Sequence, residues 1–115
     1  MSEIVQLILQ LGLAFCFLYT GISHLRDPDS WEKLLRPWVA KLLGRHRRVS
    51  IILNGLFDLT VGLWLLTPWF TWLVALIAAL HFLQIYVAIG INRQTYRDVG
   101  LSSIAVALLV ATWPA

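Results

Sequence analysis

The chain has 115 residues, of which 59% are hydrophobic and 13% are charged, and it carries a formal net charge of +3 at pH 7. An ordinary soluble domain has about 25% charged residues, so the composition excludes that class and predicts one integral membrane domain over residues 1–115. The basic residues lie beside apolar segments, which indicates membrane-flanking charge and not a nucleic-acid partner. The lipid bilayer is the first partner to expect.

The first apolar segment, residues 4–25, contains no Asp, Glu, Lys or Arg and is long enough to cross a hydrocarbon core about 30 Å thick. Its N-terminal flank lacks the basic region of a signal peptide, so we expect the segment to be retained. Small or polar residues recur at every fourth position, at Gly12, Cys16, Thr20 and His24, which predicts a face that packs closely against another helix. Cys16 is the only cysteine, so thiol redox chemistry within the chain is unsupported.

Residues 26–48 form the one long polar connection. Asp29 and Glu32 have the spacing of a capping box, and apolar residues then recur at helical intervals beside a basic face. This pattern predicts an amphipathic helix over about 29–44 that lies in the membrane interface. Pro37 lacks a backbone N–H, so we expect it to kink or split this helix.

Three more apolar segments follow, over about 49–66, 72–91 and 99–113. A short uncharged turn at 67–71 joins the first two, which must therefore lie antiparallel and adjacent. The last segment carries small residues at helical spacing, which predicts a second packing face: Ser103, Ala107 and Ala111. The predicted fold class is an all-α membrane protein, an antiparallel four-transmembrane-helix bundle with an interfacial amphipathic helix between helices 1 and 2.

All nine Lys and Arg residues lie either in the 26–48 connection or in the expected polar loop at 92–98. With four spans these two segments share one side of the membrane, and the positive-inside rule places that side in the cytoplasm. Both termini are then outside. We expect a multi-pass protein of the cell membrane, the inner membrane of a bacterium or archaeon.

Asp58 lies near the middle of the second span, where a carboxylate is costly and by default marks a functional site. With a rise of about 1.5 Å per residue, Asp58 and His81 lie about 13 and 15 Å from the cytoplasmic interface, on two adjacent helices. We therefore expect their side chains to approach each other inside the bundle. Further polar residues continue the same lining toward the cytoplasm: Asn54, Gln84, His24 and Asp98.

Two roles for this pair remain open. An ionised Asp58 beside a protonated His81 would form a proton-accepting ligand site, whereas a neutral pair would be a buried hydrogen bond that sets helix register. His24 could join them around a metal ion, but no tight ligand spacing supports a metal site, and none is predicted. Nucleotide-binding and hydrolase motifs are absent from the sequence.

Three motifs resemble the DoxX-like family of small four-helix integral membrane proteins. They are Gly12…Phe17…Gly21…His24 followed by Asp27-Pro28, then Asp58-x-x-x-Gly62-Leu63, then Arg97-Asp98-Val99-Gly100-Leu101. The resemblance covers nearly the whole chain. Two positions depart from the family pattern, because His24 stands where Lys is more frequent and Asp58 stands where Glu is common.

The family takes its name from a membrane subunit of a thiosulfate–quinone oxidoreductase. The resemblance therefore implies an accessory subunit of a membrane redox or respiratory complex, with quinone as a cofactor that the residues themselves do not show. It supplies no catalytic residue, so whether the chain is an enzyme stays open. The candidates for a ligand or proton site are Asp58, His81, Asn54, Gln84, His24, Asp98 and Arg97.

The leading hypothesis is such an accessory subunit, with a polar intramembrane pocket and with protein partners in a membrane complex. One alternative is a small proton-coupled transport protein that works as a homo-oligomer. Another is a structural assembly factor. The residues do not identify the substrate or ligand.

Overall fold

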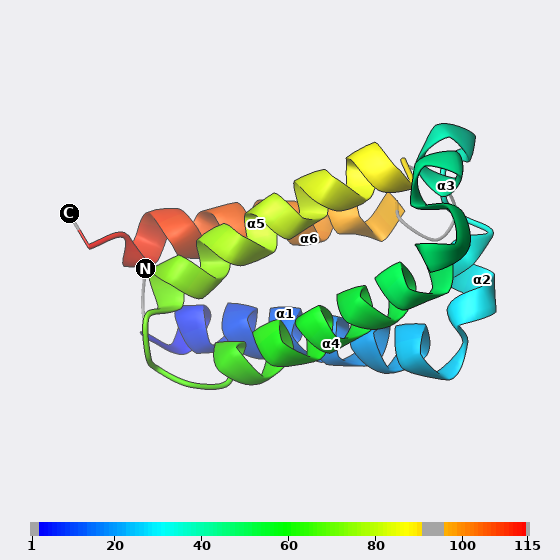
Figure 1. Ribbon diagram of the computed structural model, residues 1–115. Helices are drawn as coiled ribbons and strands as arrows, with labels where there is room; N and C mark the ends of the chain where they lie inside the picture. The colour runs from blue at the N-terminus through cyan, green and yellow to red at the C-terminus, as the bar shows by residue number, and fades with distance from the viewer. Residues whose placement is uncertain (1–2, 91–95, 115) are drawn as a thin grey trace.

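The computed structural model describes residues 3–90 and 96–114, and all regular secondary structure in these residues is helical. The elements are α1 (Glu3–Arg26), α2 (Pro28–Glu32), α3 (Pro37–Leu43), the 3-10 turn η1 (Gly44–His46), α4 (Arg47–Leu65), α5 (Thr71–Ala88) and α6 (Tyr96–Thr112). The four long helices run side by side, while α2 and α3 lie across one end of them (Figure 1). The start of α1, the α4–α5 turn and the end of α6 lie at the opposite end.

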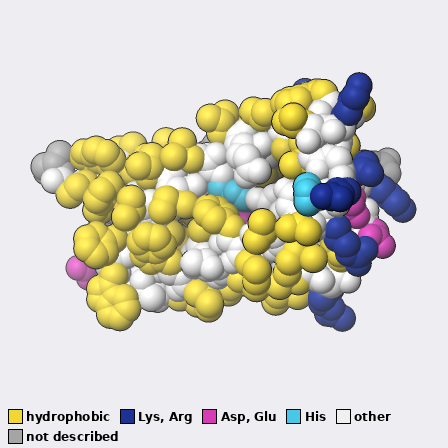
Figure 2. Space-filling view, viewed as in Figure 1, with side chains coloured by type: hydrophobic (Ala, Val, Ile, Leu, Met, Phe, Trp, Pro, Cys, Tyr) yellow, Lys and Arg dark blue, Asp and Glu magenta, His cyan; other side chains and the backbone are white. Residues whose placement is uncertain are grey.

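Three stretches of the described chain are long and apolar enough to cross a membrane: Glu3–Arg26, Pro37–Leu65 and Thr71–Ala88. Hydrophobic side chains cover much of the visible outer face of the long helices, as a lipid environment requires (Figure 2). The expected multi-pass membrane protein is therefore confirmed. The fourth expected span corresponds to α6, which has 17 residues and is shorter than the other candidates.

Helices α1 and α4 make the closest contact in the bundle because glycines face each other where they cross. A Cβ atom placed on Gly21 would lie 2.8 Å from the carbonyl oxygen of Gly55, and one placed on Gly62 would lie 2.8 Å from Cγ of Leu18. These approaches leave no room for a methyl group, so the backbones pack directly against each other. This crossing holds the middle of α4 close to α1.

The packing face predicted for α1 is correct only at His24, which lies against Gly55 of α4. A Cβ atom on Gly12 would meet nothing within 4 Å, and Cys16, Thr20 and His24 line a cavity described below. The reason is that α1 carries small residues on more than one face, and the glycines of α4 select the face that contains Gly21. The face predicted for the last helix was wrong, because Ser103 and Ala111 are exposed while Ala105 and Leu108 are buried.

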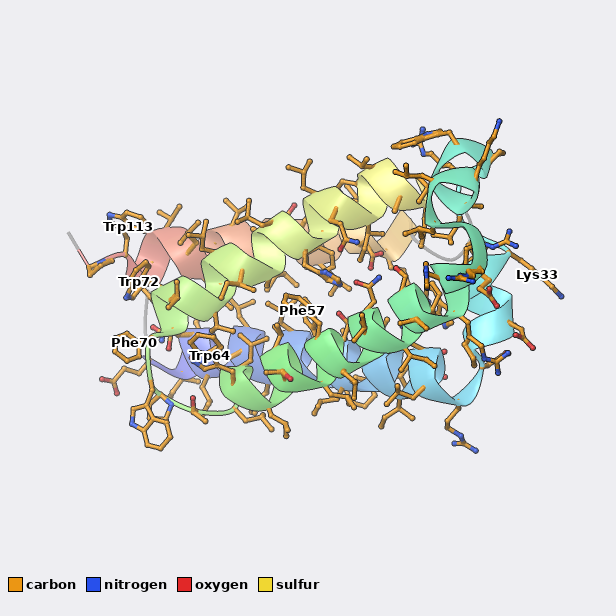
Figure 3. All side chains as sticks on the ribbon, viewed as in Figure 1. Lys33, Phe57, Trp64, Phe70, Trp72 and Trp113 are labelled. Carbon is orange, nitrogen blue, oxygen red and sulfur yellow. The ribbon has the colours of Figure 1, made fainter. Side chains whose placement is uncertain are left out.

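Helices α5 and α6 form the second close pair, and a short turn connects α4 to α5. In this turn Phe70 adopts a left-handed backbone conformation, with φ of 51°, immediately before α5 begins. Trp64, Phe70, Trp72 and Trp113 gather at this end of the bundle (Figure 3). An aromatic cluster of this kind is typical of a membrane–water interface.

The apolar core fills the half of the bundle nearest that turn. It contains large and small side chains from all four long helices: Leu13, Ala14, Phe17, Val61, Leu65, Val74, Ala75, Ala78, Phe82, Ala105 and Leu108. Alanine from α1, α5 and α6 lets the helices pack closely there. Toward α2 and α3 the interior becomes polar, so the core ends where the candidate site begins.

The expected interfacial helix is split into α2 and α3, and Pro37 is the first residue of α3. The cap at the start of α2 is Asp27 and not Asp29. Its Oδ1 accepts a hydrogen bond from the backbone N–H of Ser30 at 3.4 Å, and its Oδ2 accepts one from the Ser30 hydroxyl at 2.6 Å. Pro28 occupies the first turn, where a missing N–H is harmless, so the helix begins earlier than the spacing of the acidic residues suggested.

The predicted loop at 92–98 is also corrected in part, because α6 begins at Tyr96 and includes Arg97 and Asp98. The remaining positions, 92–95, lie outside the described residues. The first turn of α6 can accept an acidic residue favourably, since its free N–H groups and the helix dipole stabilise negative charge. Asp98 lies in that first turn.

Arg36 attaches the polar connection to the end of α5. Its backbone N–H donates to the carbonyl of Ala88 at 2.9 Å, and its Nη2 donates to the carbonyl of Tyr86 at 3.0 Å. The last carbonyls of a helix have no partner within the helix and favour a cation. Gly90, with φ of 86°, lies over the guanidinium, where a Cβ would come within 2.8 Å of Nη2.

Candidate functional site

Asp58 and His81 meet inside the bundle, as their matched depth predicted. Nε2 of His81 lies 2.7 Å from Oδ1 of Asp58, and the residues are only 7% and 1% exposed. This distance would allow a hydrogen bond, but the relative orientation of the two groups does not. Neither carboxylate oxygen accepts a hydrogen bond from a described residue. The carboxylate is thus buried with an imidazole in contact and its hydrogen-bonding capacity unfilled.

His24 approaches the same carboxylate from α1. Its Nδ1 lies 3.8 Å from Oδ2 of Asp58 and 2.7 Å from the backbone carbonyl of Thr20. Because a carbonyl can only accept, Nδ1 of His24 carries the proton, and Nε2 is an acceptor when the ring is neutral. Asp58 therefore lies between two imidazoles contributed by different helices.

Trp31 holds the His24 ring in place from α2. The two rings are stacked, with centroids 4.0 Å apart and planes inclined by 14°. The indole Nε1 donates to the hydroxyl of Ser23 at 3.0 Å, so the tryptophan is itself fixed against α1. Trp31 lies in the segment predicted to form an interfacial helix, and no role at the site was predicted for it. The chain reversal at Asp27–Pro28 brings it back over α1, and no periodic pattern signals that contact.

The His81 ring is held by phenylalanines. Its centroid lies 4.8 Å from that of Phe57 and 5.9 Å from that of Phe17. Figure 3 shows Phe57 on α4, directed toward the space between α4 and α5. These apolar neighbours lower the local dielectric constant, so the interaction between Asp58 and His81 is stronger than it would be in water.

A cavity of 430 Å³ surrounds this centre, with walls from α1, α2, α4, α5 and α6. Its volume lies within the usual range of sites for small molecules. Every residue predicted for a ligand or proton site lines this cavity: Asp58, His81, Asn54, Gln84, His24, Asp98 and Arg97. The structure thus brings all seven together, although it does not establish what they bind. Cys16, which is half-buried, lines the same cavity.

The arrangement can exchange a proton. The carboxylate of Asp58 and the imidazole of His81 are 2.7 Å apart, either of them can take up a proton, and each charged form stabilises the opposite charge on its partner. His24, with its tautomer set by the Thr20 carbonyl, adds a second acceptor nearby. Within the described part of the chain, no group of His, Cys, Asp and Glu has the arrangement of a metal site.

The family described as "Methylamine utilisation protein MauE" matches residues 2–100 of the chain. It is a family of small membrane proteins, as expected, but the match is not to DoxX-like proteins. Comparison with curated proteins and with solved structures finds no match.

Proposed function

We propose that this chain, which belongs to the MauE family, is an accessory membrane protein of methylamine utilisation whose intramembrane cavity binds a small ligand and exchanges a proton with it. Asp58 and His81 are the exchanging pair, and His24 is the second acceptor. Asn54, Gln84, Arg97 and Asp98 are the polar groups that contact the ligand or its path.

The buried carboxylate of Asp58 is the observation that carries this proposal. It is 1% exposed, and neither oxygen accepts a hydrogen bond from the described residues. A pair used only to set helix register should satisfy its polar atoms, because an unsatisfied buried acceptor costs about 1–3 kcal/mol. A site that takes up a proton or a ligand needs that unfilled capacity.

The proposal includes an orientation for the chain. We place both termini outside and the basic connection of α2 and α3 in the cytoplasm, because positive charge is retained on that side. Helix α6 then crosses as a fourth, short span beside α5, and the cavity opens toward the cytoplasmic leaflet of the cell membrane.

The accessory role that we favour is that of a partner to a redox enzyme, in keeping with the resemblance to DoxX-like proteins. The chain would then work beside a redox enzyme, with quinone as a candidate cofactor and Asp58–His81 as the group that moves the proton. Reduction of a quinone, assayed with and without co-purified partner proteins, tests this role. A redox gene beside the gene for this chain would support it.

The alternative function is transport. It is favoured by the position of Asp58 and His81 in a cavity between the α1–α4 pair and the α5–α6 pair. Proton-coupled flux of methylamine in proteoliposomes would then depend on Asp58. A structural assembly factor would need no titratable group at residue 58. The Asp58→Asn variant therefore separates that class from the other two.

The main experiment is growth of a strain that lacks its own copy of this gene and is complemented with variants. Asp58→Asn keeps the size and hydrogen bonding of the side chain but cannot titrate. We expect this variant to accumulate in the membrane, to support growth on a substrate other than methylamine, and to fail on methylamine. Normal growth on methylamine with Asp58→Asn would refute a proton function.

A further inference from the structure

A second hollow, distinct from the cavity, runs between α4 and α5. It has a volume of 660 Å³ and lies open along the outer face of the two helices. Histidine side chains are visible on this side of the molecule (Figure 2), and His81, which lines the hollow, is only 7% exposed. The groove and the cavity share three polar residues on their common wall: Asn54, His81 and Gln84.

The groove exists because α4 and α5 each pack against another helix. Gly55 and Gly62 let α4 pack closely against α1, while α5 packs mainly against α6. A short turn before Thr71 joins α4 to α5, and the two helices run side by side (Figure 1). The resulting groove has apolar residues along its rim.

The rim residues face the surroundings of the protein. Leu53 is 59% exposed, Leu80 is 57% exposed and Phe57 is 38% exposed. All three lie in helices that are long and apolar enough to span the membrane. In a bilayer the part of the groove between these three residues therefore opens to the acyl chains.

Two amide side chains, those of Asn54 and Gln84, line this groove. Neither Asn54 nor Gln84 makes a hydrogen bond to another described residue. Each amide has both a donor and an acceptor, and hydrocarbon satisfies neither. Polar groups at this depth are retained where they face water or a ligand.

We infer that the α4–α5 groove is an entrance through which a ligand passes from the lipid to the Asp58–His81 pair. The ligand it takes is a neutral, lipid-soluble amphiphile with an oxygen-bearing head. The head hydrogen-bonds to Asn54, Gln84 and His81, and the apolar part lies between Leu53 and Leu80. The ligand is neutral because, among the described residues that line the groove, the ionisable side chains are two histidines, His46 and His81. This inference relies on the proposed function for the location of the site and not for its proton chemistry.

The test uses a photoreactive 4-nonylphenol with a diazirine in its alkyl chain, added to proteoliposomes of the full chain. We expect labelling of α4 and α5 that saturates and is displaced by unlabelled 4-nonylphenol. Leu80→Trp fills the groove and should reduce the saturable labelling about tenfold, equivalent to about 1.4 kcal/mol of binding free energy. Leu83→Trp is the matched control, because Leu83 is 58% exposed on the same helix but does not line the groove.

A second variant tests recognition of the head. The double change Asn54→Leu, Gln84→Leu keeps the groove apolar and open but removes both amides. Saturable labelling should disappear, while thermal stability in detergent stays equal or rises, because two unpaired polar groups are replaced by apolar ones. Saturable labelling that survives in the double variant would overturn the inference, since the amides would then contact only water.

The growth assay of Asp58→Asn keeps this inference separate from the proposed function. Labelling of the wild type that rises linearly and is not displaced, beside a growth defect of Asp58→Asn, would overturn only the entrance from the lipid. Saturable labelling beside normal growth of Asp58→Asn would support the entrance and refute the proton function.

Discussion

Gly55 of α4 lies directly against His24 of α1. A Cβ atom on residue 55 would be 2.8 Å from Cβ of His24 and 3.0 Å from the carbonyl oxygen of Gly21. A methyl group fits there only if α1 moves away, and His24 would move with it. The absence of a side chain at Gly55 therefore sets the 3.8 Å distance between Nδ1 of His24 and Oδ2 of Asp58.

Gly55→Ala should destabilise the protein and displace His24 from the site. We expect a loss of about 1–3 kcal/mol, the usual cost of adding a methyl group to a closely packed contact. Thermal unfolding in detergent measures the loss. Gly12→Ala is the control, because a Cβ on Gly12 meets nothing within 4 Å. If both variants unfold at the same temperature as the wild type, the α1–α4 contact is not as close as the structure has it.

Arg36→Ala should loosen the connection between α5 and the α2–α3 segment. It removes the hydrogen bond from Nη2 to the Tyr86 carbonyl and the cation at the end of α5, together worth about 1 kcal/mol. Hydrogen exchange of the backbone amides in residues 27–46 should become about fivefold faster.

Lys33→Ala provides the matched control for Arg36. Lys33 is exposed and extends away from the helices (Figure 3), and its removal takes away one positive charge from the same segment. Its exchange rates should equal those of the wild type. Equal acceleration in the two variants would show that charge, and not the contact with α5, holds the segment.

The proposed orientation can be measured by labelling introduced cysteines in a Cys16→Ala background. One replaces His46 in η1 and the other replaces Ser2, which lies outside the described residues. A membrane-impermeant maleimide added to intact spheroplasts should label residue 2 and not residue 46. The opposite pattern would invert the topology and place the cavity mouth on the outer side.

Cys16→Ala should leave growth on methylamine unchanged. The thiol lines the cavity but is half-buried and has no second cysteine in the chain, so no intramolecular dithiol chemistry is available to it. A packing role tolerates this small substitution. A variant that inserts normally but fails to grow on methylamine would assign chemistry to the thiol.

Charge and hydropathy were sufficient to locate the long helices and the pair at their centre. The expected first span, 4–25, compares with a helix over Glu3–Arg26. The depth argument for Asp58 and His81 succeeded because a short turn holds α4 and α5 antiparallel, so equal distance from one end means proximity. In the structure, Nε2 of His81 lies 2.7 Å from Oδ1 of Asp58.

Contacts that depend on the rotation of a helix, or on a change of chain direction, could not be predicted in this way. The spacing of small residues in α1 suggested a face containing Gly12, whereas Gly55 selects the face of Gly21. The stacking of Trp31 on His24 depends on the sharp reversal before α2. Composition alone could not predict whether α6 crosses the membrane, because its 17 residues are at the lower limit of length for a transmembrane helix.

Removing either member of the Asp58–His81 pair should destabilise the protein strongly. Asp58→Leu leaves the imidazole of His81 without its partner, and His81→Leu leaves the buried carboxylate with His24 alone, 3.8 Å away. Such losses amount to about 3–5 kcal/mol when the remaining group stays charged. Replacing both residues by leucine should recover part of this loss, because no uncompensated polar group remains. Thermal unfolding of the four proteins in detergent gives the coupling free energy.

The sign and size of that coupling decide how the pair is used. A coupling of about 0.6 kcal/mol would match an ordinary polar contact between membrane helices, whereas 2–3 kcal/mol requires opposite charges at low dielectric. Asp58→Asn completes the argument, since it keeps the contact with His81 but cannot accept a proton. If the coupling is large and Asp58→Asn folds without supporting growth on methylamine, the proton itself is what the site uses. Additive losses in the cycle would show that the two side chains do not interact, despite their 2.7 Å separation.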